Sequence, residues 1–173
     1  MQSIQTVSEN TIYVGASDRR LAKFENLFPI PRGVSYNAYV ILDEKNALLD
    51  TADASVGAQF LENVAAALDG RKLDYLIVDH MEPDHAAMIE AVLVRWPDLR
   101  LVVNAKTLPM LKMYFPTDSA AIDDALVVKE GDTLDLGKHK LTFVMAPMVH
   151  WPEVMMTFDT TTGTLFSADA FGT

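Results

Sequence analysis

Six consecutive residues, 80–85, contain four side chains that can bind a metal ion, and they come directly after an apolar run typical of a buried strand. The strand is expected over Leu73 to Val78, and the four side chains are those of His80, Glu82, Asp84 and His85. On a strand, side chains at i and i+2 share a face, and on a helix those at i and i+4 do. No regular element points all four the same way, so the segment is predicted to be a loop around a binding site.

The loop is predicted to connect a strand to a helix. Pro83 disfavours the helical conformation for Glu82, so a helix is expected to begin at Asp84 or just after it. Strand-to-helix loops commonly carry the chemistry of α/β proteins. Taken singly, Asp84 could be only a helix cap and each histidine only a satisfied imidazole. Two imidazoles and two carboxylates packed this closely nevertheless favour a cation that organises them.

Two more potential ligands follow strand-like runs further along the chain. His150 comes after the run 141–145, and Asp169 ends the run 165–169. Side chains at the ends of several strands can meet at one edge of a sheet. The alternatives are that Asp169 is a turn residue and that His150 only packs against Trp151.

Other segments are assigned no chemistry. His139 lies between Lys138 and Lys140 and is expected in a solvated turn. Residues 161–164 lie between two strand-like runs and are predicted to form a hairpin turn. Tyr36, Trp151 and Phe171 are candidates for lining a pocket, with core packing as the alternative.

The order and spacing of the six candidate ligands resemble those of the flavodiiron proteins, also called A-type flavoproteins. Residues 28–41 and 47–51 also resemble the opening strands of that family, and the resemblance runs from about residue 13 to residue 173. It implies an α/β (α+β) fold, the αββα sandwich of the metallo-β-lactamase type. It also implies these ligands: for one iron His80, Glu82 and His150, for the other Asp84 and His85, and as a bridge Asp169.

Within that resemblance, Glu82 separates two kinds of chemistry. Hydrolases of the wider superfamily carry a histidine at this position, and a carboxylate there hardens the site and favours iron over zinc. Some members of the flavodiiron family leave the imidazole at the position of His85 off the metal. No catalytic residue beyond the metal ligands is implied.

The resemblance implies an oxidoreductase that reduces dioxygen to water or nitric oxide to nitrous oxide at two iron ions. Electrons would come from FMN on a flavodoxin-like domain of the opposite subunit in a head-to-tail homodimer, or through a rubredoxin-type donor. Two alternatives stay open. One is a dinuclear metal hydrolase, and the other is a non-catalytic diiron oxygen-binding sensor.

The chain is interpreted as one domain over residues 1–173 that corresponds to the N-terminal portion of the family's metal domain. The family supplies a final histidine and the flavodoxin-like domain from later sequence, so the FMN-binding residues are unknown. We expect the fold to be truncated, with an unpaired edge on its last sheet. A second chain is expected to provide the missing part.

Composition excludes several classes of function. The 24 acidic against 14 basic residues give a net charge of −10, which argues against a nucleic-acid partner. Without cysteine there are no disulfides, thiolate zinc sites or cysteine nucleophiles. No apolar run approaches a membrane span and no leader is recognisable, so a cytoplasmic location without membrane partners is expected.

The apolar pattern also predicts the order of the elements. The chain is expected to begin with antiparallel strands, alternate helices and strands through its middle, and finish in hairpins. The expected strands are 11–14, 36–42, 47–50, 73–78 and 99–104, and the expected helices are 56–68, with Gly70 at its end, 86–95 and 108–115.

Overall fold

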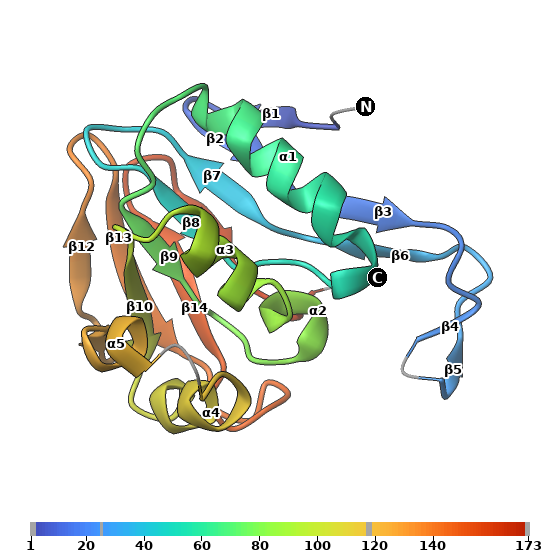
Figure 1. Cartoon of the computed structure of the whole chain (residues 1–173). Coiled ribbons are helices and arrows are strands. Elements are labelled where there is room, and N and C mark those ends of the chain that lie inside the picture. The colour runs from blue at the N-terminus through green and yellow to red at the C-terminus, as the bar shows by residue number, and fades with distance from the viewer. Residues whose placement is uncertain (1–2, 25, 117–118, 172–173) are drawn as a thin grey trace.

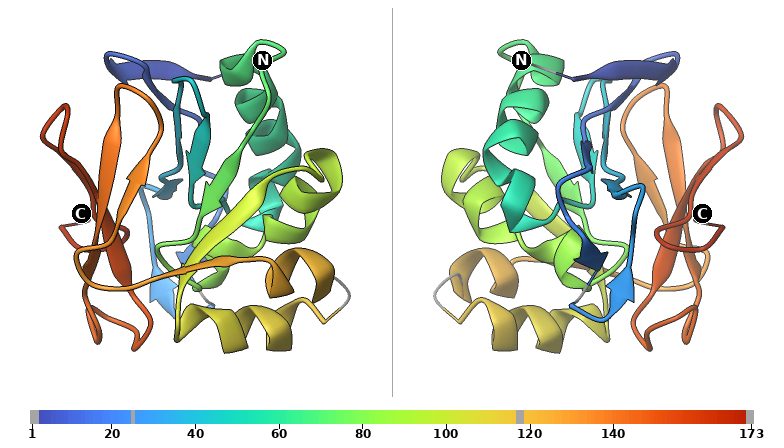
Figure 2. Two further views of the ribbon diagram at one scale, coloured as in Figure 1. Left: turned by 90° about the vertical axis from the view of Figure 1, so that its left-hand side faces the viewer. Right: turned by 90° about the vertical axis from the view of Figure 1, so that its right-hand side faces the viewer.

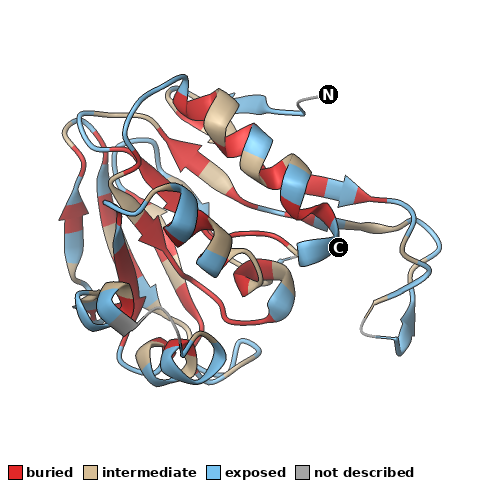
Figure 3. Cartoon of the chain, viewed as in Figure 1, coloured by how far each residue is buried: buried red, intermediate tan, exposed pale blue. Residues whose placement is uncertain are grey.

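Three strands in the middle of the chain are apolar on both faces and form the centre of the fold. In the computed structural model, which describes residues 3–24, 26–116 and 119–171, these strands are β8 (Ala47–Leu49), β9 (Tyr75–Ile77) and β10 (Arg100–Asn104), and they run parallel. Leu48 packs into one core and its neighbour Leu49 into another. Strands without a polar face must be covered on both sides, and Figure 3 shows these strands buried.

The three strands belong to a seven-stranded mixed sheet. Its order is β1-β2-β7-β8-β9-β10-β11. The pairs from β1 to β8 are antiparallel, as expected for the N-terminal strands, and β11 is parallel to β10. The remaining strands of the sheet are β1 (Gln5–Ser8), β2 (Thr11–Tyr13), β7 (Tyr39–Ile41) and β11 (Leu126–Val128).

Helices cover one face of this sheet (Figures 1 and 2). The larger core lies between them and the sheet, where Phe60 and Val64 of α1 and Ile89 of α3 are fully buried. The helices are η1 (Ala54–Val56), α1 (Gly57–Leu68), α2 (Pro83–Ala86), α3 (Ile89–Arg95), α4 (Thr107–Tyr114) and α5 (Ser119–Asp123). Within the described ranges, every helix is too short or too polar to cross a bilayer.

A second sheet packs on the opposite face (Figure 2). Its order is β12-β13-β14-β15, all antiparallel, and Phe143 and Met155 fill the core between the sheets. Across the described residues, the order of layers is helices, sheet, sheet, and β15 is an edge strand. The strands are β12 (Thr133–Asp135), β13 (Lys140–Met145), β14 (Met155–Asp159) and β15 (Thr164–Phe166).

Two small ribbons complete the chain. β3 (Ala16–Asp18) pairs with β6 (Val34–Tyr36), and β4 (Lys23–Phe24) pairs with β5 (Phe28–Pro29). In Figure 1 the β4–β5 hairpin projects from the body of the molecule. The strand expected over 36–42 is therefore divided between β6 and β7.

The bounds predicted for the helix over 86–95 were wrong. The structure has two helices in this segment, and the first of them begins before residue 86. α2 begins at Pro83, with Glu82 as its N-cap, and α3 begins only at Ile89. The carbonyl of His85 would accept from Ile89 in a continuous helix. Instead it accepts the backbone N–H of Thr51 at 2.8 Å and the Thr51 hydroxyl at 2.6 Å.

The C-terminal half differs from the expected series of hairpins at two elements. The helix α5 was not expected, and β11 joins the first sheet in parallel. The turn predicted over 161–164 is confirmed, since it connects the antiparallel strands β14 and β15. The helix expected over 56–68 is also confirmed as η1 followed by α1, and it ends with Asp69 and Gly70 at positive φ.

The expectation that His139 lies in a solvated turn was wrong. Its side chain is buried, and its Nδ1 lies 2.8 Å from Asp159 Oδ2. The backbone N–H of His139 donates to Asp43 Oδ2 at 2.6 Å. The β12–β13 turn therefore folds back on both sheets, and the neighbouring lysines gave no indication of this.

Candidate metal centre

The loop after β9 turns sharply at Glu82 and Pro83, which places several polar side chains at one edge of the sheet. Glu82 has an extended backbone, with φ −61° and ψ 145°, and Pro83 opens α2. Proline fits the first helical position because its missing N–H would have no partner there. The reversal buries His80, Glu82 and His85 and leaves Asp84 partly exposed.

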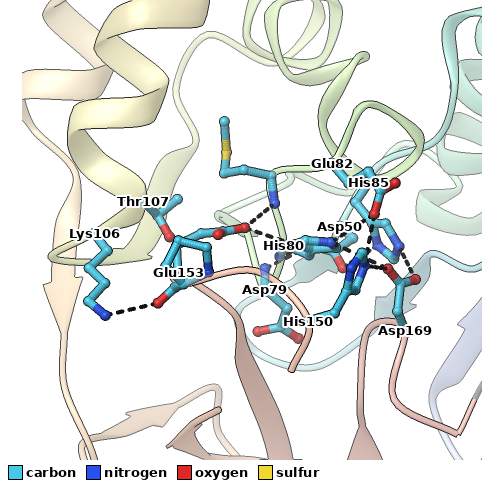
Figure 4. Close-up of polar contacts among 12 residues, drawn as sticks. Asp50, Asp79, His80, Glu82, His85, Lys106, Thr107, His150, Glu153 and Asp169 are labelled. Atoms are coloured by element: carbon cyan, nitrogen blue, oxygen red, sulfur yellow. Dashed lines mark hydrogen bonds and ion pairs between the residues drawn. The ribbon is translucent and has the colours of Figure 1, made fainter. Parts of the chain in front are cut away.

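Two further residues reach this loop from the second sheet. His150 lies in the connection between β13 and β14, and Asp169 lies beyond the end of β15. Figure 4 shows both beside the loop residues. The structure therefore brings together all six residues predicted from the sequence, which are His80, Glu82, Asp84, His85, His150 and Asp169.

Four of them form what we call the first donor group: His80, Glu82, His150 and Asp169. Glu82 Oε2 lies 3.2 Å from His80 Nε2 and 3.0 Å from His150 Nε2. Asp169 Oδ2 lies 3.3 Å from His80 Nε2 and 3.0 Å from His150 Nε2. The donor atoms all lie within 4.8 Å of one another, about twice the 2.0–2.3 Å length of a metal–ligand bond.

The second donor group consists of Asp84, His85 and Asp169. His85 Nε2 lies 2.7 Å from Asp169 Oδ1 and 3.8 Å from Asp84 Oδ2. One oxygen of Asp169 thus faces the first group and the other faces the second. A carboxylate shared in this way is arranged to bridge two ions.

The side chains around Asp169 strongly favour its ionised form. Burial alone would raise the pKa of Asp169, but hydrogen bonds from His80, His85 and His150 outweigh it and hold the pKa well below its usual range. Burial likewise disfavours a charged His85, yet hydrogen bonds to Asp169 and Asp50 raise the pKa of His85 well above its ordinary value. Positive charge among these carboxylates is therefore strongly stabilised.

Asp84 provides the test of whether the residues fit a metal. Burial raises its pKa to about 6, with the charge of His85 opposing and that of Asp169 adding to the shift. Its buried Oδ1 has no hydrogen-bond partner among the described residues. The other oxygen, Oδ2, lies 3.8 Å from His85 Nε2, and a buried carboxylate with one unpaired oxygen beside an imidazole fits a metal ligand. It does not act as a cap, because Glu82 holds that position.

Two carboxylates that the sequence analysis missed contact the Nδ1 atoms of the buried imidazoles. Asp50 Oδ2 accepts from His85 Nδ1 at 2.9 Å, and Glu153 Oε1 accepts from His80 Nδ1 at 2.8 Å. Asp50 offered a signal, since it follows the apolar strand β8 as Asp79 follows the strand before the loop. Glu153 offered none, because it lies in a connection without periodic pattern.

An open groove of about 730 Å³ leads to both donor groups. Phe171 lines it and is 85% exposed, so it does not pack in the core. Trp151 packs its ring 5.3 Å from that of His80, whereas Tyr36 is a buried core residue. The groove is lined by four of the candidate ligands and by residues of β4, β5 and their flanks: Glu82, Asp84, His150 and Asp169, and among the others Arg19, Phe24, Phe28 and Arg32.

Comparison with known proteins identifies the family. A family model described as ODP family beta lactamase matches residues 34–173. The chain belongs to the ODP family. This ODP-family chain is 38% identical over 168 residues to the anaerobic nitric oxide reductase flavorubredoxin of Klebsiella pneumoniae subsp. pneumoniae. That match covers 96% of the chain and 34% of the relative, so the chain spans about a third of the curated protein's length.

Solved structures with the same fold include flavodiiron proteins. The flavodiiron protein from Giardia intestinalis superposes with a TM-score of 0.91 at 28% identity, over 99% of this chain and 41% of that one. The rubredoxin oxygen:oxidoreductase from Desulfovibrio gigas superposes with a TM-score of 0.84 at 30% identity, over 91% of this chain and 38% of that one. The expected metallo-β-lactamase-like fold and the resemblance to flavodiiron proteins are confirmed.

Proposed function

We propose that this chain is the metal-binding domain of an oxidoreductase that reduces dioxygen to water or nitric oxide to nitrous oxide. The observation that carries the proposal is Asp169, whose two oxygens belong to two adjacent donor groups. The names of the similar proteins, a nitric oxide reductase and an oxygen oxidoreductase, support the same chemistry. The proposed ligands are His80, Glu82, Asp84, His85, His150 and Asp169.

The donor set supports iron as the resident metal. Two bound iron ions would supply one-electron chemistry to a diatomic molecule at the floor of the groove. Glu82, Asp84 and Asp169 contribute three negative charges, and a carboxylate-rich set with imidazoles suits iron better than an all-nitrogen set does. The buried histidines His80 and His85 direct Nε2 toward the donor groups, and carboxylates hold their Nδ1 atoms. The half-exposed His150 borders the groove.

The shape of the groove supports an electron donor larger than the substrate. A diatomic molecule needs a small part of 730 Å³. The aromatic rings of Phe24 and Phe28 and the guanidinium groups of Arg19 and Arg32 suit a flat, anionic cofactor. We therefore propose FMN as the donor, carried by a flavodoxin-like domain of the opposite subunit in a head-to-tail homodimer or on a separate chain. A rubredoxin-type protein would feed electrons to the flavin, in the cytoplasm.

Anaerobic reconstitution with ferrous iron tests the proposal. We expect up to two iron ions per complete site by elemental analysis. We also expect consumption of dioxygen or nitric oxide when a second chain that supplies the remaining part of the metal domain is added together with reduced FMN. The control is Glu62→Gln, an exposed change on α1 far from the loop, which should behave as wild type. A protein that binds only zinc, and that gains no reductase activity after reconstitution with iron, would refute the redox function.

The same preparation separates the two alternatives. Hydrolysis of phosphodiester or lactam substrates by the zinc-loaded protein, without reductase activity in the iron form, would establish the dinuclear hydrolase. Reversible binding of dioxygen without its consumption would establish the sensor.

A further inference from the structure

We infer that Glu153 is a positioning residue that holds His80 in the orientation and tautomer needed to bind a metal through Nε2. The inference rests on the proposed metal centre and extends it to a residue outside the ligand set. His80 and Glu153 are both essentially inaccessible to solvent, at 0% and 1% exposure. Their interaction joins the loop after β9 to the β13–β14 connection of the second sheet.

The hydrogen-bond roles at Glu153 follow from its chemistry. Glu153 Oε1 accepts the backbone N–H of Met81 at 3.0 Å and lies 2.8 Å from His80 Nδ1. A carboxylate oxygen only accepts, so Nδ1 of His80 carries the hydrogen. Nε2 is then free to bind a metal and faces Glu82 and Asp169.

Glu153 is itself held rigidly. The Asn104 side-chain amide donates to the backbone carbonyl of Glu153. The other end of the same amide, Asn104 Oδ1, accepts the N–H groups of Lys106 at 2.8 Å and Thr107 at 3.1 Å at the start of α4. The backbone position of Glu153 therefore depends on the end of β10 and on α4, and Figure 4 shows Lys106 and Thr107 next to Glu153.

The unused oxygen of Glu153 indicates that its charge has a function. Oε2 is buried and has no hydrogen-bond partner among the described residues. A purely structural anchor for Nδ1 and for the N–H of Met81 needs one acceptor oxygen, and a buried charge without further partners is unfavourable. A cation on the far side of the His80 ring would balance this charge. A carboxylate at Nδ1 also makes the imidazole a stronger donor.

Asp50 provides an internal comparison, because it supports the other buried imidazole. Asp50 Oδ2 accepts from His85 Nδ1 at 2.9 Å, and Asp50 Oδ1 accepts the N–H of Asp79 at 2.7 Å. Glu153 thus supports His80 of the first donor group, and Asp50 supports His85 of the second. Their variants should weaken different metal positions.

Anaerobic titration of the metal-free protein with ferrous iron alone measures the two positions separately. We expect Glu153→Leu to raise the dissociation constant of one position about 100-fold and Glu153→Gln about tenfold, because glutamine keeps the acceptor and loses the charge. We expect Asp50→Asn to weaken iron binding at the other position. The control Glu62→Gln should weaken binding at neither position. Should Glu153→Leu fail to fold, the glutamine variant carries the test.

A second readout reports the tautomer directly. The chain has four histidines, so ¹⁵N-histidine-labelled protein loaded with Zn²⁺ as a diamagnetic probe gives a simple NMR spectrum, with His139 as an internal reference. We expect a protonated Nδ1 on His80 in the wild type and in Glu153→Gln, and loss of that slowly exchanging proton in Glu153→Leu.

Unchanged dissociation constants in folded Glu153→Gln, or equal weakening of both positions, would overturn the positioning role while leaving the metal centre intact. A protonated Nε2 on His80 in the zinc-loaded wild type would also overturn it. A wild-type protein that binds neither iron nor zinc would overturn the proposed function together with this inference.

Discussion

Glu82 contributes two things to the first donor group, a donor atom and a negative charge. Its Oε2 contacts both His80 and His150 at 3.0–3.2 Å, and its side chain is almost fully buried. An imidazole at this position would keep a donor atom and remove the charge. The preference of the site for iron over zinc therefore depends mainly on the side chain of Glu82.

We predict that Glu82→His shifts metal selection towards zinc and that Glu82→Gln weakens iron binding without changing the fold. Both changes remove the charge that stabilises iron. Reconstitution in equimolar ferrous iron and zinc, followed by elemental analysis, gives the iron-to-zinc ratio, with Glu62→Gln as the control. Equal iron content in the wild type and both variants would show that Glu82 is not a ligand.

At the scale of single residues, the sequence predicted that the donor groups come together. It did not predict the carboxylates of Glu153 and Asp50 that hydrogen-bond the buried histidines. His80, Glu82, Asp84 and His85 lie within six positions, so their proximity was visible in the chain itself. Glu153 reaches His80 across 73 positions. Only the packing of two sheets brings them together, and no local pattern records it.

The β12–β13 turn is an element whose position depends on a buried hydrogen bond between His139 and Asp159. His139 Nδ1 contacts Asp159 Oδ2 at 2.8 Å, and the hydroxyl of Thr162 donates to the same oxygen at 2.7 Å. Burial opposes ionisation of Asp159, yet these hydrogen bonds outweigh it and lower the pKa of Asp159.

We predict that Asp159→Asn lowers the free energy of unfolding by about 1–3 kcal/mol near neutral pH, as expected for hydrogen bonds to a charged group. Because the folded-state pKa is depressed, this stabilisation is complete above the ordinary aspartate pKa of about 3.9 and is lost as the pH falls through the folded value. Urea denaturation of the metal-free protein across this range should show the two proteins converging in acid. Asp98→Asn, on an exposed loop, is the matched control, and a difference that stays constant with pH would contradict the prediction.

Asn104 connects β10 to α4 and to the β13–β14 connection, which carries His150 and Glu153. We predict that Asn104→Ala destabilises the protein by about 0.5–2 kcal/mol, as for loss of a helix cap, because the N–H groups of Lys106 and Thr107 lose their acceptor. Asn104→Asp keeps that acceptor and loses the bond to the Glu153 carbonyl. It should therefore retain most of the stability in urea denaturation, and an equal loss in both variants would contradict the capping role.

Local patterns predicted most elements and failed where a distant residue interrupts them. The periodicity of residues 86–95 indicates one helix, yet Thr51 takes the carbonyl of His85 and divides it into α2 and α3. The short β11 gave no indication that it would pair in parallel with β10. In both cases the deciding contact joins segments that lie far apart in the sequence.

The metal centre joins both sheets of the molecule. Four of its side chains come from the loop after β9 in the first sheet, and His150 and Asp169 come from the second. An ion bound to both sets adds cross-links between layers that are already joined by the apolar core around Phe143 and Met155 and by hydrogen bonds such as that of Thr157 to Asp79.

We predict that metal raises the thermal stability of the whole protein. At free metal one hundred times the dissociation constant, binding adds about 2.7 kcal/mol, which corresponds to a rise in melting temperature of about 5–10 °C for a chain of this size. Calorimetry with ferrous iron and with a chelator measures the difference. Asp169→Ala should abolish most of it, since both donor groups include that residue, whereas Glu62→Gln should keep it.

The edge position of β15 has a consequence for how the site opens over time. The loop that carries His80 springs from β9, in the interior of a covered sheet, where amide protons exchange with solvent only when the whole fold opens. Asp169 is held beyond β15, which has a neighbour on one side only among the described residues. Brief fraying of that edge would release one wall of the site while the other stays in place. Bound ions would then be released into the open groove on the timescale of that fraying, without unfolding of the protein.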